Sequence, residues 1–378
     1  MMCTDYTYNL LKKDFEANKQ IVLFVGAGIN YSTGHQILWN DVMEYLFKNV
    51  LSSITSANGF TAEETRLLQK LFEQTDCPEI PTDLKKYVSE EFPNIVKAYI
   101  VKKNLGLKYI PIIQEFIYRK IDYNYIRDAF EKHHKLKGYR DTSANNQANA
   151  INGLFEIARL ILLSSNIKAV VTYNYDNFLT QAVKIIQDAP GQYFVPDELK
   201  CYENRLRSIY GGLDGNGKLN LVDIFGDQYD KSINNDVIPI YHVHGYIPPM
   251  REIQTIDSNS IVLSLDEFYD NIRNVYCWQT DTQMHFLSHY TCIFIGSSMS
   301  DMTIQRMLYN VQSHGNNDKI YCFQADDKSS KPELKFYNAL RELKRNFLQS
   351  YGVSIIYNEE GYPKMYTEDI HNLLTITK

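Results

Sequence analysis

Small and polar residues directly follow several apolar runs in this sequence, and their types suit contact with phosphate or sugar groups. The turn Gly26-Ala27-Gly28 follows the run Ile21–Val25 and leads to Asn30. Glycines let the backbone approach a pyrophosphate, and a following helix N-terminus can supply N–H donors. The stricter G-x-G-x-x-G pattern fails because Tyr31 occupies the third glycine position, and no G-K-[ST] follows. The alternative is a tight strand-to-helix turn that binds nothing.

The segment Thr172-Tyr173-Asn174-Tyr175-Asp176 follows the apolar run Ile167–Val171. An Asn side chain is both donor and acceptor, so Asn174 could hold a water or a ribose hydroxyl. Asn and Asp at a strand end most often cap the next helix, and Asp176 could cap one over 177–187. Taken alone, these residues favour capping.

His244-Gly245 follows the run Val237–Tyr241. Histidine is the side chain best suited to proton transfer near neutral pH. A histidine in this position could also just satisfy a local hydrogen bond. His242 lies on the same face of an extended chain, which raises the alternative of a two-histidine metal site. No third ligand is evident from spacing.

A fourth segment of this kind begins after the apolar run 293–295. It contains Gly296, Ser297 and Ser298 and reaches Asp301 at the expected start of a helix. The small side chains permit close approach of a ligand, and Ser and Asp can bind sugar hydroxyls or phosphate. The alternative for Asp301 in particular is an ordinary helix N-cap.

The elements around these segments alternate between strand and helix. Strands are expected at 21–25, 167–172, 237–242, 261–265, 291–295, 319–323 and 353–357, and helices at 6–18, 39–50, 266–275, 301–312, 332–349 and 367–374. This alternation predicts an α/β fold with a Rossmann-like, doubly wound parallel sheet. Ligands bind at the carboxyl ends of strands in such sheets, so the polar strand ends should converge on one site.

Two stretches interrupt the alternation. From Leu46 to Leu163, apolar residues recur at three- and four-residue spacing and no clean strand is evident, apart from a polar loop at 139–149. We therefore expect one domain formed by 1–45 and 164–378, with a large helical insertion at 46–163. The stretch 201–231 is rich in Gly, Asp and Asn and indicates irregular structure or a small β excursion.

Composition excludes several classes of protein. The 378 residues carry a net charge of -6, so no global basic field attracts nucleic acid, and direct nucleic-acid binding is not predicted. No signal segment is evident, and no apolar run approaches the roughly 20 residues of a membrane span. The six cysteines include no C-x-x-C, which argues against a structural zinc or a disulfide framework. We expect a cytoplasmic protein.

Together these motifs resemble the sirtuin-like superfamily, specifically its zinc-free branch of NAD-consuming effectors in bacterial anti-phage defence. The resemblance spans about Ile21 to Asp301 and rests on the opening glycine turn, a T-x-N-Y-D at 172–176, the H-G of His244, and a late G-x-S-x-x-D at 296–301. A further match is Leu263–Tyr269, similar to the family's S-x-x-[DE]-[FY] segment. Asn30 replaces the usual serine. The missing zinc ribbon and the large insertion favour NAD hydrolysis over protein deacetylation.

The resemblance implies that NAD+ is the substrate, that no zinc is needed, and that the products are nicotinamide and ADP-ribose. It implies that Asn174 positions the attacking water or the ribose and that His244 acts as the base. Asp176 would orient Asn174, contact the ribose or serve as a cap. The implied NAD+-binding residues are Gly26, Ala27, Gly28 and Asn30 on the pyrophosphate side, with Gly296, Ser297, Ser298 and Asp301 toward the adenosine half.

Alternative functions are a non-catalytic NAD- or ADP-ribose-binding regulatory subunit, and an NAD-dependent protein deacylase or ADP-ribosyltransferase. An NADase must be held inactive until it is triggered, which predicts control through assembly: a homo-oligomer, a partner protein or both. The resemblance adds a HerA-type ATPase as a partner. The helical insertion is the candidate oligomerisation region. No membrane partner is predicted.

Overall fold

The computed structural model describes residues 2–33, 39–72, 79–119, 121–135, 152–210, 218–226, 237–249, 261–262, 277–313, 320–325 and 334–376. The expected polar loop at 139–149 lies outside these ranges. So do residues 263–276, which include the expected helix at 266–275 and the Leu263–Tyr269 match. Residues 261–262 of the strand expected at 261–265 are described, and they have no regular secondary structure.

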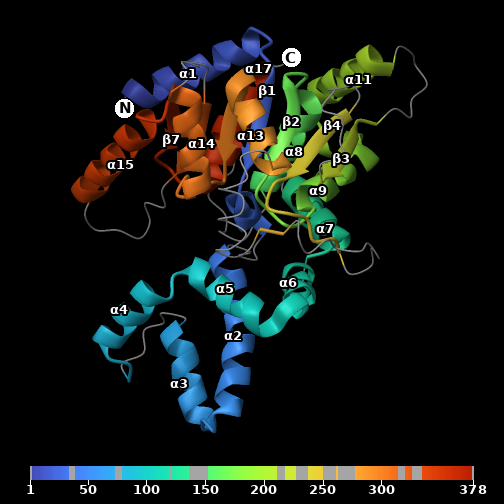
Figure 1. Ribbon diagram of the computed structural model, residues 1–378. Coiled ribbons are helices and arrows are strands. Elements are labelled where there is room, and N and C mark those ends of the chain that lie inside the picture. The colour runs from blue at the N-terminus through green and yellow to red at the C-terminus, as the bar shows by residue number, and fades with distance from the viewer. Residues whose placement is uncertain are drawn as a thin grey trace.

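A sheet of seven parallel strands, in the order β3-β4-β2-β1-β5-β6-β7, forms the centre of the protein (Figure 1). This confirms the predicted Rossmann-like fold. The strands are β1 (Ile21–Val25), β2 (Ile167–Thr172), β3 (Asn220–Ile224), β4 (Val237–His242), β5 (Thr291–Ile295), β6 (Ile320–Ala325) and β7 (Val353–Asn358).

Helices cover both faces of the sheet because its strands are apolar on both sides. Along β1, Ile21, Leu23 and Val25 belong to one core cluster, whereas Val22 and Phe24 belong to the other. Successive side chains of a strand point to opposite faces, so a fully apolar strand must be buried twice. The first cluster includes residues of α1 (Met2–Glu16), α8 (Asn152–Leu163), α9 (Phe178–Asp188) and α17 (His371–Ile376), and the second those of α13 (Trp278–His289), α14 (Met302–Ser313) and α15 (Leu334–Gln349).

The segment 201–231 was only partly anticipated. Its first ten residues complete α11 (Pro196–Tyr210), so the prediction of irregular or β structure was wrong there. Tyr202 is buried and Leu206 and Ile209 pack against the first core, a helical spacing that the polar composition obscured. The later edge strand β3 agrees with the expected β excursion.

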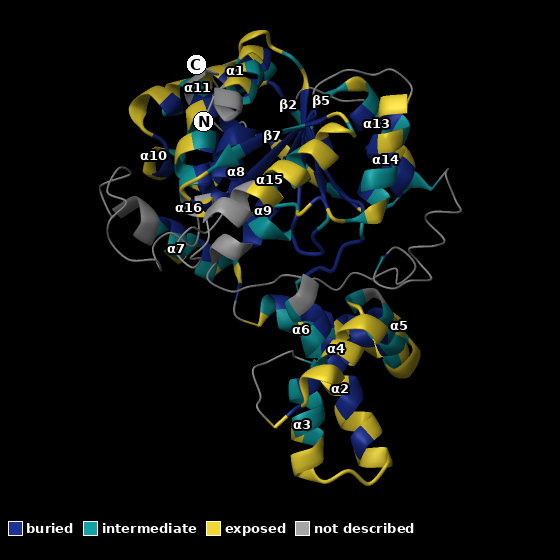
Figure 2. Cartoon of the chain, turned by 90° about the vertical axis from the view of Figure 1, so that its left-hand side faces the viewer, coloured by how far each residue is buried: buried dark blue, intermediate teal, exposed yellow. Residues whose placement is uncertain are grey.

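Five helices between β1 and β2 project from the sheet (Figures 1 and 2). They are α2 (Trp39–Ala57), α3 (Ala62–Phe72), α4 (Thr82–Glu91), α5 (Asn94–Leu105) and α6 (Tyr109–Tyr118). Next along the chain, α7 (Tyr123–Lys135) and α8 pack against α9 beside the sheet. The division of the chain at 46 and 163 remains a prediction.

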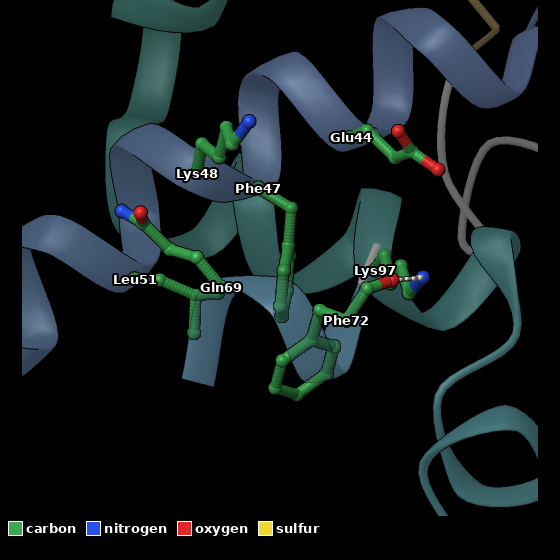
Figure 3. Close-up of a pocket in the computed structure, with 7 residues that line it drawn as sticks. All are labelled: Glu44, Phe47, Lys48, Leu51, Gln69, Phe72 and Lys97. Atoms are coloured by element: carbon green, nitrogen blue, oxygen red, sulfur yellow. Dashed lines mark hydrogen bonds between the residues drawn. The ribbon is translucent and has the colours of Figure 1, made fainter. Parts of the chain in front are cut away.

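Aromatic packing joins the projecting helices to one another. The rings of Phe47 and Phe72 lie 4.7 Å apart between centroids, in a hollow that Lys97 also lines (Figure 3). Lys97 Nζ donates to the carbonyl oxygen of Phe72 at 3.4 Å, and burial lowers its pKa. The hollow is therefore part of the helix packing, away from the strand ends. None of the helices in the described part of the chain has the length and apolarity needed to cross a bilayer.

The remaining described helices are short or irregular. A 3₁₀ segment (Ala27–Thr33) follows β1 directly, and another (Gly106–Lys108) separates α5 from α6. α10 (Pro190–Tyr193) precedes α11. The helix expected at 367–374 is composite: α16 (Tyr362–Lys364), a π-helical segment (Met365–Ile370) and then α17.

Candidate functional site

The four polar strand ends meet at one edge of the sheet. β1 lies between β2 and β5, so the chain winds outward in both directions from β1, as at the switch point of a doubly wound fold. Val25 is in register with both Thr172 and Ile295, and Thr172 with His242. Backbone hydrogen bonds then extend the pairing beyond the strands: Tyr173 N to Val25 O at 3.0 Å, Val243 N to Thr172 O at 3.2 Å, and Gly26 N to Ile295 O at 3.0 Å.

The glycines after β1 and β5 allow two turns to interlock. A Cβ added to Gly26 would lie 2.6 Å from Gly296 O, and one on Gly28 would lie 2.7 Å from Gly296 Cα. Gly296 itself has φ of 68°, a conformation that favours glycine. Turn-to-turn packing alone is therefore a sufficient reason for these glycines, whether or not a pyrophosphate binds there.

The interlocked turns also use most of the local N–H donors. Gly28 N donates to Gly296 O at 2.9 Å, and Gly26 N is bonded to the end of β5. The Ala27 N–H has no acceptor among the residues that the structure describes. If this turn contacts a pyrophosphate, as predicted, Ala27 is the amide of the three that remains for it.

Asp176 joins the first turn to the second strand end. Its Oδ2 accepts from Asn30 Nδ2 at 2.6 Å, and its Oδ1 accepts from the backbone N–H of Phe178, the first residue of α9, at 3.0 Å. Both side chains are buried. Burial raises the pKa of Asp176 to about 6, against the opposing effect of these two hydrogen bonds and of His242. Asp176 therefore holds Asn30 and the helix start, rather than Asn174.

Asn174 presents a buried acceptor at the same edge. Its N–H donates to Thr172 Oγ1 at 3.1 Å, and its Nδ2 donates to Gly26 O at 3.4 Å. Its Oδ1 is buried and has no hydrogen-bond partner within the described part of the chain. A buried carbonyl oxygen without a donor costs about 1–3 kcal/mol, so this atom suits a ligand that brings a hydroxyl or a water.

His244 is the partly accessible member of the site. It lies in the turn after β4, its side chain is 25% exposed, and its ring meets that of Tyr173 edge-on at 5.1 Å. Nε2 is 4.0 Å from Asp301 Oδ2. Burial lowers the pKa of His244, and the Asp301 carboxylate opposes this effect. A lowered pKa leaves the imidazole neutral near pH 7, the form that can accept a proton.

His242 does not join His244, although an extended strand would have put both on one face. β4 ends at His242, and the following turn directs the two residues to different neighbours. His242 is buried against Asp223 and the backbone of Asn174. Within the described ranges, no three His, Cys, Asp or Glu side chains are grouped so as to hold a metal ion.

The turn after β5 is largely held by its own hydrogen bonds. Ser297 Oγ accepts from Met299 N at 3.3 Å, and the hydroxyls of Ser298 and Ser300 are 2.6 Å apart. Asp301 Oδ1 accepts from Thr303 N at 2.7 Å in the first turn of α14, as the N-cap alternative anticipated. Its other oxygen faces His244, so this residue lies beside the candidate base.

Sequence reasoning missed the contribution of α6. Tyr118 donates to Ile247 O at 2.8 Å, and Gln114 donates to Pro248 O at 2.6 Å, so α6 holds the segment that follows His244. Tyr118 also lies 3.4 Å from Asn177 Oδ1 at the start of α9. Tyr118 and Ile247 are 129 positions apart, and no local pattern joins them. Asp223, on the edge strand, was missed for the same reason.

Comparison with known families gives one match. A family model described as the SIR2-like domain matches residues 168–356, half of the chain. The matched range begins in β2 and ends in β7, so it contains Asn174, Asp176, His244 and the turn 296–301, but not the turn after β1. No curated protein matches the chain. SIR2-like domains are enzymes that depend on NAD+.

Proposed function

This chain belongs to the SIR2-like family, and we propose on that premise that it is an NAD+ glycohydrolase (an NADase). The reaction cleaves the nicotinamide–ribose bond of NAD+ and gives nicotinamide and ADP-ribose. The observation that carries the proposal is a pair of groups on neighbouring strand ends, beside the switch point. One is the buried acceptor Asn174 Oδ1, which has no partner among the described residues, and the other is a partly exposed histidine, His244, whose pKa is lowered.

Each residue has a definite part in the proposed hydrolysis. The C–N bond breaks with its electron pair going to the nicotinamide ring, and positive charge develops at the ribose. Asn174 Oδ1 accepts a hydrogen bond from the attacking water or a ribose hydroxyl. The water oxygen bonds to the ribose carbon, and His244 accepts the proton that the water loses. Asp176 bonds to Asn30 and to the first N–H of α9, and so holds the turn after β1 against the start of that helix.

The proposed NAD+ contacts follow the two interlocked turns. The Ala27 N–H meets the pyrophosphate, while Gly26, Gly28 and Asn30 shape that turn. The proposed contacts in the turn after β5 are Gly296, Ser297, Ser298 and Asp301. Ser298 is exposed, and its hydroxyl, which lies 2.6 Å from that of Ser300, supports contact with a sugar or phosphate oxygen. We propose that the reaction uses no zinc.

The direct test is to incubate the purified protein with NAD+ and to follow nicotinamide by chromatography, with no acylated peptide present. Asn174→Ala and His244→Ala should each abolish release. Asn49→Ala and His289→Ala are matched controls, since both residues are exposed and, within the described part of the chain, their side chains form hydrogen bonds to their own helices. Unchanged turnover in both site variants would refute the assignment. If nicotinamide is released only when an acylated peptide or a protein acceptor is present, the activity is deacylation or ADP-ribosyl transfer. If the protein binds NAD+ and does not turn it over, it is a regulatory subunit.

We further propose that the activity serves anti-phage defence by NAD+ depletion and is controlled by assembly. The family resemblance supports a homo-oligomer and a HerA-type ATPase partner. The projecting helices and the segments that connect them support a role in oligomer contacts, because they expose large apolar side chains: Phe60, Leu84, Tyr87 and Leu107. Replacing Leu84 and Tyr87 with glutamate should lower the native mass while NAD+ binding persists. Retention of the native oligomer mass would contradict this role.

A further inference from the structure

The imidazole of His242 is buried between two hydrogen-bond acceptors. Its Nδ1 lies 3.2 Å from the carbonyl oxygen of Asn174, and its Nε2 lies 3.0 Å from Asp223 Oδ1. The side chain is 1% exposed, and the ring of Tyr246 packs on it at 4.8 Å. Neither ring nitrogen is therefore turned toward water.

The two contacts fix the protonation of the ring. A carbonyl oxygen and a carboxylate oxygen accept hydrogen bonds and donate none, whereas a neutral imidazole carries one N–H. Both contacts form together when both nitrogens are protonated and the ring is an imidazolium. Thr180 Oγ1 donates to the same Asp223 oxygen at 2.7 Å, so this oxygen accepts a hydrogen bond from Thr180 on one side while it faces Nε2 on the other.

We infer that His242 is a positioning residue, held as an imidazolium by Asp223 and Thr180, that fixes the main chain of Asn174 at the reacting ribose. This inference rests on the proposed hydrolase function for its kinetic part. Asn174 is held at its N–H by Thr172, at its carboxamide by Gly26, and at its carbonyl by His242. Of these three anchors, His242 carries the charge, so it forms the strongest kind of bond.

The groups that surround His242 suit a positive ring. Asp223 is its direct partner, and the buried Asp176 carboxyl interacts with it electrostatically and is kept closer to its ionised form. Tyr118 stays neutral, since burial raises its pKa well above the usual value, and Tyr246 presents its ring. One imidazolium thus lies near two carboxyl groups, beneath the strand ends.

The protonation state can be tested without any assumption about the reaction. Histidine nitrogens are labelled with ¹⁵N, and the His242 signals are identified by their loss in His242→Gln. We expect both His242 nitrogens to carry a proton at pH 8, with the exposed His289 as the reference for a ring in water. A single N–H on His242 at that pH would overturn the inference.

Kinetics then test the positioning role. In Asp223→Asn the new amide can donate to Nε2, so a neutral ring can keep both contacts and the spectrum should show one N–H. His242→Gln, which loses the ring, should lower kcat by roughly 10- to 100-fold with little change in the KM for NAD+. Asp223→Asn should retain more of kcat than His242→Gln does. A lower melting temperature with unchanged kcat in both variants would show a merely structural role and refute the inference.

The two proposals fail in different ways. If the wild type releases no nicotinamide under any condition, the proposed hydrolase function fails, while the spectrum still decides the state of His242. If the wild type is active and the variants retain full kcat, the hydrolase function stands and the positioning role fails.

Discussion

Replacing Gly28 with alanine would push apart the two turns that carry the site. The added Cβ would lie 2.7, 2.8 and 3.0 Å from the Cα, O and C atoms of Gly296. All three are backbone atoms, and the same stretch accepts the Gly28 N–H at 2.9 Å. The clash therefore cannot be relieved by rotation of a side chain, and the turns after β1 and β5 must separate.

The expected cost follows from this geometry. Overpacking of a tight contact costs about 1–3 kcal/mol, and weakening the Gly28–Gly296 hydrogen bond adds about 1 kcal/mol. Alanine also reduces the conformational entropy of the unfolded chain, which offsets about 0.4–1 kcal/mol of this loss in stability. The net loss is about 1–3 kcal/mol. For 378 residues the unfolding entropy is about 0.8 kcal/mol per degree, so the melting temperature should fall by about 1–4 °C.

Scanning calorimetry measures this change, with Gly191→Ala as the matched control. Gly191 lies in α10, and an added Cβ there would meet no atom within 4 Å, so its melting temperature should stay the same or rise. Calorimetric titration should also show weaker NAD+ binding by Gly28→Ala, because the turns form part of the proposed site. If Gly28→Ala has the same melting temperature and the same affinity for NAD+ as the wild type, the interlocking of the turns is refuted.

Three further predictions concern the charges and supports of the site. Burial raises the pKa of Asp176 to about 6, so between about pH 4 and 6 the native state binds a proton that the unfolded chain has released. As the pH rises through this window, the free energy of unfolding of the wild type should therefore fall by up to about 3 kcal/mol relative to that of Asp176→Asn. Urea unfolding of both proteins at about pH 4 and about pH 6 measures this change, and a difference between them that stays constant with pH contradicts it. The Asp301 carboxylate raises the pKa of His244 against the effect of burial, so Asp301→Asn should lower that pKa and move the acid limb of the kcat/KM profile to lower pH. An acid limb that moves to higher pH would refute the interaction between Asp301 and His244. Tyr118→Phe removes the hydroxyl bonded to Ile247 O, so it should lower kcat at a stability cost of about 1 kcal/mol, whereas unchanged kinetics would show that α6 does not support the segment after His244.

The sheet could be predicted because its central strands are recognisable in the sequence as apolar runs. The runs Ile21–Val25 and Thr291–Ile295 are continuous apolar strands between helices, and each forms a strand with the same bounds. β3 gave a weaker signal, since its exposed and half-buried residues alternate at the sheet edge in a polar surrounding. Apolar periodicity reports burial, so it is strongest for the central strands.

The contacts within the site could be predicted only in part. The order of the strand ends indicated that Asn174 and His244 would lie at one edge, and the parallel registers agree. The pairing of His242 with Asp223 and the contact of Tyr118 with Ile247 join residues that no local pattern relates. Such side-chain pairs depend on how the elements pack, and that packing is not written in the spacing of either residue.

Capping and function, which the sequence presented as alternatives for Asp176 and Asp301, are combined at both positions. Asp176, which precedes the N-cap residue Asn177, accepts from the first N–H of α9 with one oxygen and binds Asn30 with the other, and Asp301 caps α14 while its second oxygen faces His244. A helix that begins at a strand end needs a cap, so the cap residue is necessarily close to any ligand at that edge. The more informative groups are those that the fold leaves unused. Two such groups in the described part of the site are Asn174 Oδ1 and the Ala27 N–H, an acceptor and a donor on adjoining strand ends, which is why we look for the sugar at one and the phosphate at the other.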